Sequence, residues 1–310
     1  VHRLGKQLQK KYYNQRIKNL KTTNNSNWWK EIKGICGMQQ ITNDPIGNLT
    51  YCNETITANE LPELINEFLC SLTSKVAPLA SSVIDQLKSE LYVSNDSVVV
   101  SELEVYQALS TLKSRKASLS DAIPNKLLLN LADILSAPIA ALVNSSIRTG
   151  CIPREWKISR VTLIPKVNPA FRVETDIRPI SVSCPIAGVA ERIISRHFDE
   201  HFTPRQDPNQ FGVTRDRSRV LALVKLCHIL FTASDDCCNY IRILFIDFTK
   251  AFDLIDHNVL LNKFVDYEFP LWLKTWSLSF LHERSQFVKA GDITSSVMTI
   301  NAGAPQGTRA

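Results

Sequence analysis

Asp247 ends an apolar, strand-like run that begins at Ile243, where its carboxylate could take part in metal-dependent chemistry. Carboxylate oxygens are ligands that hard divalent cations prefer. Two such cations can stabilise the attacking and leaving oxygens of a phosphoryl transfer. Asp247 supplies one half of a candidate site of this kind. No Asp-Asp pair in the sequence supplies the other half, because Asp235-Asp236 precedes the run in a polar loop.

Basic side chains in other loops could bind the phosphates of a nucleoside triphosphate beside that carboxylate. Lys166 follows an apolar, strand-like run, and Pro179 keeps Arg178 out of helical geometry. Arg215 and Arg217 belong to a basic loop. Each feature alone is weak evidence, because an Asp after a strand often only forms a turn. Surface arginines, likewise, often do no more than pair with a nearby acid.

Hydrophobic periodicity indicates the elements that must position these residues. We expect helices at 61–72, 82–91, 101–113, 125–135, 138–148, 186–201, 218–233, 258–264 and 271–281. Strands or extended segments are expected at 156–164, 176–181, 241–248, 287–289 and 297–301. A basic helix is expected over residues 1–35, and a linker over roughly 74–100. The helix at Ser101 begins with a capping-box pattern, Ser101-Glu-Leu-Glu104.

The composition indicates an intracellular globular protein with a substantial core. The 310 residues are 44% hydrophobic and 21% charged, and the mean hydropathy is -0.07. No apolar run reaches the length of a membrane span, and no signal-peptide pattern opens the chain. The eight cysteines form no C-x-x-C pair, which favours reduced thiols. The ends at Val1 and Ala310 suggest a piece of a longer protein.

Positive charge is concentrated at the start of the chain. Residues 1–40 hold nine Lys or Arg and one acid, whereas the net charge of the whole chain is +6. A basic arm on a near-neutral body suggests attraction to phosphate backbones, although a solvated helix face explains it equally well. Trp28-Trp29 in this arm could stack on RNA bases or could dock the arm onto the body.

Six sequence blocks, in order, resemble the reverse transcriptase of non-LTR (LINE-type, jockey-like) retrotransposons. That family's blocks include W-K…I-P-K, F-R-P-I-S, Q-F-G-F-R, the first catalytic Asp block and G-x-P-Q-G-[ST]. The matching segments are 124–128, 150–157 with 161–166, 177–181, 210–215, 245–253 and 303–308. One block is weak evidence, but six in sequence order are specific. The resemblance covers residues 101 to 310, with a looser match upstream.

The resemblance implies roles for four residues near the catalytic block. Asp247 would bind both Mg²⁺ ions (or Mn²⁺), and the Phe248 carbonyl would complete one metal's coordination. Phe252 would lie under the sugar of the incoming nucleotide and clash with a ribose 2′-OH, which favours dNTPs. A plain core position for Phe252 stays open. Gln306 would contact the incoming nucleotide or the template base.

The resemblance also implies roles for the basic residues. Lys166 and Arg178 would face the triphosphate or the template, and which residue does which stays open. Arg215 and Arg217 would contact the nucleic-acid backbone. Asp253 and Asp256 are expected to cap or pair near the site. The family's aromatic-x-Asp-Asp block would lie beyond Ala310, so we expect a fragment that ends before that block.

The implied fold is α+β: the fingers and a partial palm of a right-hand polymerase behind a basic helical extension. The expected divisions are 1–100 for the extension and linker, 101–240 for the fingers and 241–310 for the partial palm. The implied partners are an RNA template, a DNA primer and dNTPs, with no membrane. The parent element would act in the nucleus and cytoplasm. The alternative is a catalytically inactive remnant that retains only RNA binding.

Overall fold

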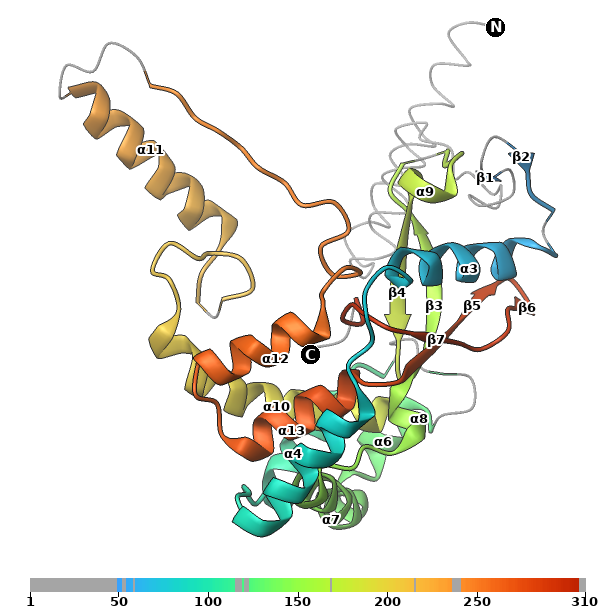
Figure 1. Cartoon of the computed structure of the whole chain (residues 1–310), viewed down its shortest axis with the longest axis vertical. Helices are drawn as coiled ribbons and strands as arrows, with labels where there is room; N and C mark the ends of the chain where they lie inside the picture. The colour runs from blue at the N-terminus through green and yellow to red at the C-terminus, as the bar shows by residue number, and fades with distance from the viewer. Residues whose placement is uncertain are drawn as a thin grey trace, which may run out of the picture. The chain divides into compact units, whose positions relative to one another are not determined.

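The computed structural model describes residues 49–51, 54–57, 59–114, 119, 123–167, 169–214, 216–235 and 241–306 (Figure 1). The chain divides into two compact units. The described part of the small unit comprises residues from 49 to 56 and from 165 to 177. The described part of the large unit comprises residues from 57 to 164 and from 178 to 306. The expected basic helix and Trp28-Trp29 lie outside the described residues.

The small unit is a hairpin beside a short helix. Strands β1 (Thr50–Tyr51) and β2 (Glu54–Thr55) pair antiparallel, and α9 (Val173–Asp176) lies beside β1. The Asp176 carboxylate accepts hydrogen bonds from the backbone amides of Phe171 and Arg172, each at 3.0 Å. These bonds lower the pKa of Asp176, because they stabilise the charged form. The carboxylate therefore closes the turn that enters α9.

A mixed sheet forms the first layer of the large unit. Its strands are β3 (Ile158–Pro165), β4 (Ile177–Val182), β5 (Arg284–Ala290), β6 (Ile293–Thr294) and β7 (Met298–Ile300), in the order β4-β3-β5-β6, with β7 also on β5. β3 and β5 run parallel, with Ile158 opposite Ser285. β6 and β7 pair antiparallel with β5. β5 is thus the strand that most of the sheet shares.

Helix α3 (Leu61–Thr73) packs against β5 and is fastened to it by polar side chains. The buried amide of Gln286 donates to Asn66 Oδ1 at 3.1 Å. Asn66 in turn donates to the Ser296 carbonyl at 2.9 Å, and the Glu63 carboxylate accepts from the Ser296 amide at 2.7 Å. Because these buried amide groups are hydrogen-bonded, they have partners that replace the water lost on burial.

The second layer of the large unit is helical. It contains α4 (Ser81–Ser94), α5 (Glu102–Ser110), α6 (Asn125–Asn130), α7 (Ala132–Thr149), α8 (Arg154–Lys157), α10 (Pro185–Phe202), α12 (His257–Asp266) and α13 (Leu271–Leu281). In its core Trp276 stacks on Phe280, with ring centroids 5.2 Å apart. The Trp276 indole N–H donates to Ser146 Oγ at 3.1 Å, so the ring is buried with its polar atom paired. None of the helices described combines the length and apolar character that crossing a membrane requires.

Most of the expected elements are present, with shifted ends. The predicted capping box is confirmed at Ser101 and Glu104. Pro138 lies inside α7 instead of opening a helix, and the break falls at Leu131. The helix expected at 82–91 is present as α4. It lies within residues 74–100, expected to be a linker, and its Ile84 and Leu91 are buried in the core. Mixed helices and strands agree with the coarse α+β prediction.

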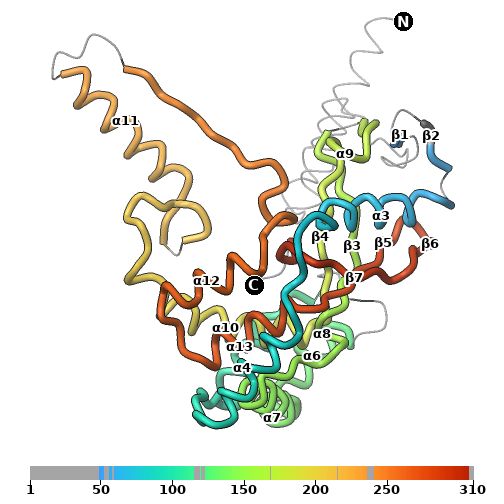
Figure 2. The backbone as a smooth tube through the Cα atoms, viewed as in Figure 1, coloured from blue at the N-terminus to red at the C-terminus, as the bar shows by residue number. Residues whose placement is uncertain are grey.

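One predicted strand is wrong. Residues 241–248 form no strand, and every side chain in the segment is exposed. The segment runs as an extended chain after α11 (Arg219–Asp235) (Figure 2). A sequence rich in β-branched and aromatic residues becomes a strand only where a neighbouring strand completes its backbone hydrogen bonds. Among the described residues no strand pairs with this segment.

Arg284 is a buried charge where the sheet meets the helical layer. Its guanidinium lies 4.3 Å from the centre of the Phe280 ring, and its Nη2 donates to Ser159 Oγ on β3 at 2.8 Å. Burial lowers the pKa of Arg284 to about 10, while the buried Glu191 on α10 favours its charged form. The site therefore links β3, β5, α10 and α13 through one guanidinium.

We predict that Arg284→Met lowers the free energy of unfolding by about 3–5 kcal/mol, because it removes a buried cation that favours the charged form of the buried Glu191 carboxyl. The measurement is urea unfolding followed by circular dichroism. The double variant Arg284→Met with Glu191→Gln removes both charges and should recover part of the loss. An equal loss in the single and double variants would contradict this electrostatic coupling.

Candidate functional site

The turn at 302–306 is fastened to residues 252–257 by the main chain. The Gly303 amide donates to the Ile255 carbonyl, and the Ala304 amide donates to the Phe252 carbonyl, both at 2.8 Å. Gly303 has φ +87°, and a Cβ added there would lie 2.8 Å from the Asp253 carbonyl oxygen. Only glycine fits this close approach without strain. The Pro-Gln turn and residues 252–255 are therefore held together.

The same turn also contacts β4. The Ser181 amide donates to the Gln306 carbonyl at 2.7 Å. Ser181 ends the Arg-Pro-Ile-Ser block, and Asp253 ends the block that begins at Phe245. Three of the six sequence blocks thus meet, although they are far apart in the chain.

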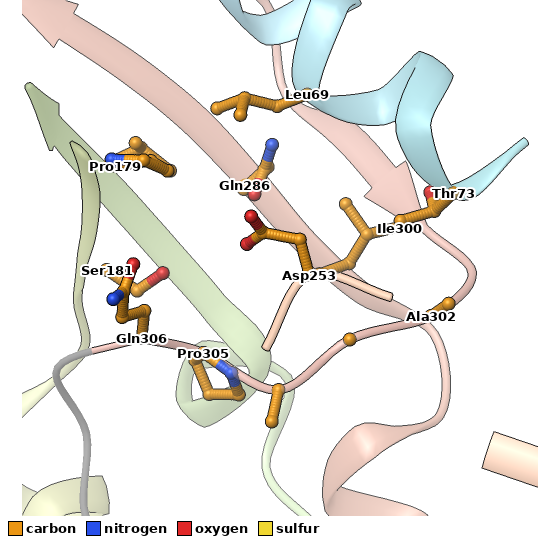
Figure 3. A pocket seen from close by; sticks show the side chains of 13 residues that line it. Leu69, Thr73, Pro179, Ser181, Asp253, Gln286, Ile300, Ala302, Pro305 and Gln306 are labelled. Carbon is orange, nitrogen blue, oxygen red and sulfur yellow. The ribbon is translucent and has the colours of Figure 1, made fainter. Parts of the chain in front are cut away.

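A cavity of about 40 Å³ lies where these blocks meet (Figure 3). Its polar lining includes the carboxylate of Asp253, the amides of Gln286 and Gln306, and the hydroxyls of Ser181 and Thr73. Sites for small ligands usually measure hundreds of Å³, so this space is large enough for water or one small polar group. The cavity does not hold a whole nucleotide.

The segment that carries Asp253 is positioned from two further directions. The Lys250 ammonium lies 4.2 Å from the centre of the Phe68 ring on α3. At the other end, Asp256 caps α12, because its Oδ1 accepts from the Asn258 amide at 2.7 Å. The capping role predicted for Asp256 is confirmed. Asp253, expected to be a capping or pairing residue, lines the cavity.

His257 fixes the same turn from inside. The side chain is 2% exposed, and its Nε2 lies 2.8 Å from the Gly303 carbonyl. A carbonyl can only accept, so Nε2 must carry the proton. Burial lowers the pKa of His257 below its ordinary 6.5, against the opposing effects of the Gly303 hydrogen bond and of Asp256. The imidazole is therefore neutral at pH 7.

Two of the predicted site residues are close to this cavity. Gln306 lines it, and Phe252 is joined through its carbonyl to the turn that carries Gln306. The Phe252 side chain is 50% exposed, so it does not occupy a core position. Sequence reasoning missed Gln286, which lies on β5 outside the six matched blocks and carries no motif signal.

Asp247 and Phe248 do not line the cavity. Both belong to the exposed extended segment 241–248, and Phe248 is 79% exposed. Among the described residues no three His, Cys, Asp or Glu side chains gather in a group that could hold a metal ion. The described donors therefore do not fit a two-ion centre, because Asp247 belongs to no such group.

The predicted basic residues have different surroundings. Lys166 in the small unit is exposed, and its backbone amide donates to the Asp176 carbonyl at 2.7 Å. Arg178 is exposed on β4 in the large unit. Arg217 donates to the Gln210 carbonyl at 2.9 Å, and its guanidinium lies 5.5 Å from the centre of the Phe211 ring. Arg217 therefore braces its own loop, and Arg215 lies outside the described residues.

Comparison with known proteins gives a consistent set of relatives. The chain is 26% identical over 253 residues to the protein named "Probable RNA-directed DNA polymerase from transposon BS" of Drosophila melanogaster. It is 28% identical over 235 residues to the RNA-directed DNA polymerase from mobile element jockey of the same species. The chain resembles the RNA-directed DNA polymerases of transposons. This similarity confirms the resemblance that the six blocks indicate.

The match to these polymerases is partial on their side. The aligned regions cover 81% and 74% of this chain, but only 27% and 25% of the two relatives. The chain thus spans about a quarter of the length of the transposon polymerases it matches. No family model matches the chain.

We predict that Gly303→Ala destabilises the large unit by about 1–3 kcal/mol, since the new Cβ meets the Asp253 carbonyl at a positive φ. Urea unfolding measures the loss, and hydrogen exchange at the Ala304 amide reports whether the turn opens. Gly188→Ala is the matched control, because a Cβ there meets nothing within 4 Å. Equal effects of both substitutions would show that the turn is not tightly fitted.

We predict that stability falls as the pH drops below about 6.5, because the unfolded state binds a proton that buried His257 excludes. In the His257→Gln variant the fall between about pH 7 and about pH 5 should be smaller. Some fall should remain, because burial also lowers the pKa of His282. Urea unfolding at each pH provides the measurement, and identical pH profiles would rule out the assignment to His257.

Proposed function

We propose that this chain is part of an RNA-directed DNA polymerase that extends a DNA primer on an RNA template with dNTPs. The observation that carries the proposal is the meeting of the Arg-Pro-Ile-Ser, Ala-Phe-Asp and Gly-Ala-Pro-Gln blocks around one cavity. The same blocks belong to the resemblance that the sequence comparison supports. In this proposal the large unit contributes to fingers and palm.

The proposal assigns nucleotide selection to Phe252 and Gln306. The Ala304 amide binds the Phe252 carbonyl, and Ala304 is two residues before Gln306. This main-chain hydrogen bond holds the Phe252 and Gln306 side chains near each other. Selecting between nucleotides by shape requires such fixed positions. The half-exposed Phe252 ring is accessible to a sugar, where it would disfavour a 2′-OH.

The proposal assigns metal binding to Asp247, with the Phe248 carbonyl, and Mg²⁺ or Mn²⁺ as the ion. A bound ion would neutralise charge on the phosphate oxygens. For Asp247 to serve in this way, further ligands must join it, because no group of three or more His, Cys, Asp or Glu side chains exists among the described residues. Lys166, Arg178, Arg215 and Arg217 are assigned to phosphate or template contacts, and of these Lys166 and Arg178 have exposed side chains.

The competing function is RNA binding without synthesis. The observation that favours it is that Asp247 lies in an exposed, extended segment and belongs to no group of three or more metal-ligating side chains among the described residues. A remnant of this kind would bind RNA with an affinity that falls steeply as salt rises, because phosphate contacts release counterions. The site of action proposed for the parent element is the nucleus and cytoplasm.

We predict that the chain, within its natural polypeptide, incorporates dNTPs on an RNA template with Mg²⁺, and that Asp247→Asn lowers the rate by at least about a hundredfold, since a neutral amide binds the ion poorly. Primer extension on a labelled DNA primer measures the rate. Asp292→Asn is the control, because Asp292 is exposed in the turn before β6. Unchanged synthesis by the Asp247 variant would exclude polymerase chemistry at this site, and salt-sensitive RNA binding without synthesis would support the remnant.

A further inference from the structure

Lys250 begins the turn that carries Phe252, and its backbone adopts a left-handed conformation with φ +54°. The Lys250 carbonyl accepts hydrogen bonds from the Asp253 amide at 3.0 Å and from the Leu254 amide at 3.2 Å. Residues other than glycine adopt a positive φ at a cost, and they keep it only where surrounding contacts hold them. The position of the Phe252 turn therefore depends on a contact that holds Lys250.

The side chain of Lys250 supplies such a contact. Its ammonium lies over the Phe68 ring on α3, 4.2 Å from the ring centre, and both residues are half-buried. A cation over the face of an aromatic ring is attracted by the ring, and more strongly where water is partly excluded. The contact thus ties the turn to a helix that is far away in the sequence.

Helix α3 is a firm anchor for this contact. The Gln286 amide on β5 donates to Asn66 Oδ1 on α3 at 3.1 Å. Further along the same helix, Leu69 and Thr73 line the cavity (Figure 3). The helix that carries Phe68 precedes the six matched blocks in the sequence. An element outside the blocks therefore borders the candidate site and contacts the turn beside it.

We propose that Lys250, held by Phe68, is a positioning residue for nucleotide selection. Its cation–π contact fixes the turn of residues 250–254 and thereby sets where the Phe252 ring lies. The Ala304 amide binds the Phe252 carbonyl as a second anchor. The role rests on the proposed function, in which Phe252 selects dNTPs.

The alternative use of the Lys250 ammonium is direct binding of a triphosphate. A phosphate contact would strengthen the binding of dNTPs and rNTPs alike, because both carry the same triphosphate. A positioning contact instead affects the choice between them, because they differ in the 2′-OH that the Phe252 ring would meet. The contact with the Phe68 ring favours positioning, since it already engages the ammonium.

The first test measures hydrogen exchange in the 310-residue chain. Lys250→Met should speed exchange at the Asp253 and Leu254 amides at least about threefold, because the turn loses its anchor. Phe68→Leu should have the same effect, and the double variant should add little to either single variant. Lys250→Arg keeps a cation over the ring and should preserve the wild-type rates.

Lys225→Met is the matched control for exchange. The Lys225 ammonium lies 5.9 Å from the centre of the Phe211 ring, so this substitution removes a contact of the same kind from another loop. The exchange rates in the Phe252 turn should not change. Circular dichroism confirms that each variant is folded. Additive effects of Lys250→Met and Phe68→Leu, or unchanged exchange in both, would overturn the proposed anchoring.

The second test uses the chain within its natural polypeptide. Primer extension gives kcat/KM for a dNTP and for the matching rNTP, and the ratio of the two measures selection. Lys250→Met and Phe68→Leu should each lower this ratio about three- to tenfold. Lys250→Arg should keep the ratio, and so should Lys225→Met.

The two measurements distinguish failure of this role from failure of the proposed function. In Lys250→Met, an equal rise of KM for both nucleotides with an unchanged ratio would overturn the positioning role and leave the polymerase function standing. A ratio lowered by Lys250→Met but not by Phe68→Leu would overturn the pairing of the two residues. A wild-type chain without synthesis would overturn the proposed function and with it the role in selection, while exchange still decides whether Phe68 anchors the turn.

Discussion

The guanidinium of Arg284 is the constraint on which the large unit depends. Arg284 is the first residue of β5. Its guanidinium donates to Ser159 on the parallel strand β3 and lies against the Phe280 ring at the end of α13. The buried carboxylate of Glu191 on α10 balances its charge. A buried charge tolerates little displacement, because each of its contacts offsets a large cost of dehydration. The junction of sheet and helices is therefore fixed in register as well as in place.

The candidate site is built outward from that junction. β5 carries Gln286 two residues after Arg284, and β7 pairs with β5 before the chain enters the Gly303 turn. The turn then meets β4 through the Ser181 amide and the segment after Phe252 through two further amides. The cavity is thus bordered by elements whose positions the buried charge already sets.

Much of the fold could be predicted from the sequence because its signals are local. The capping box at Ser101 and the periodicity of α10 depend on neighbours three and four residues away. The segment 241–248 could not be predicted in the same way. Its β-rich sequence indicates a strand, but pairing depends on a partner that no local pattern specifies.

The site was predictable only in part for a related reason. Gln306 and Phe252 stand in motif blocks, and the structure brings those blocks together. Gln286 and the buried role of His257 arise from tertiary packing, and no spacing in the sequence indicates them. Lys166 and Arg178 could be recognised from the sequence blocks in which they stand. The blocks do not indicate what the charged groups of these two residues contact.

Besides the hydrogen bond of His257, three links hold the Gly303 turn, and these three involve only main-chain groups: the Gly303, Ala304 and Ser181 amides and the carbonyls that they bind. Any residue offers the same carbonyl. Substitutions at Phe252, Ile255 or Gln306 therefore leave the links in place, whereas Gly303 itself cannot be exchanged freely. A turn tied by its main chain can therefore keep its shape through extensive divergence of the side chains around it.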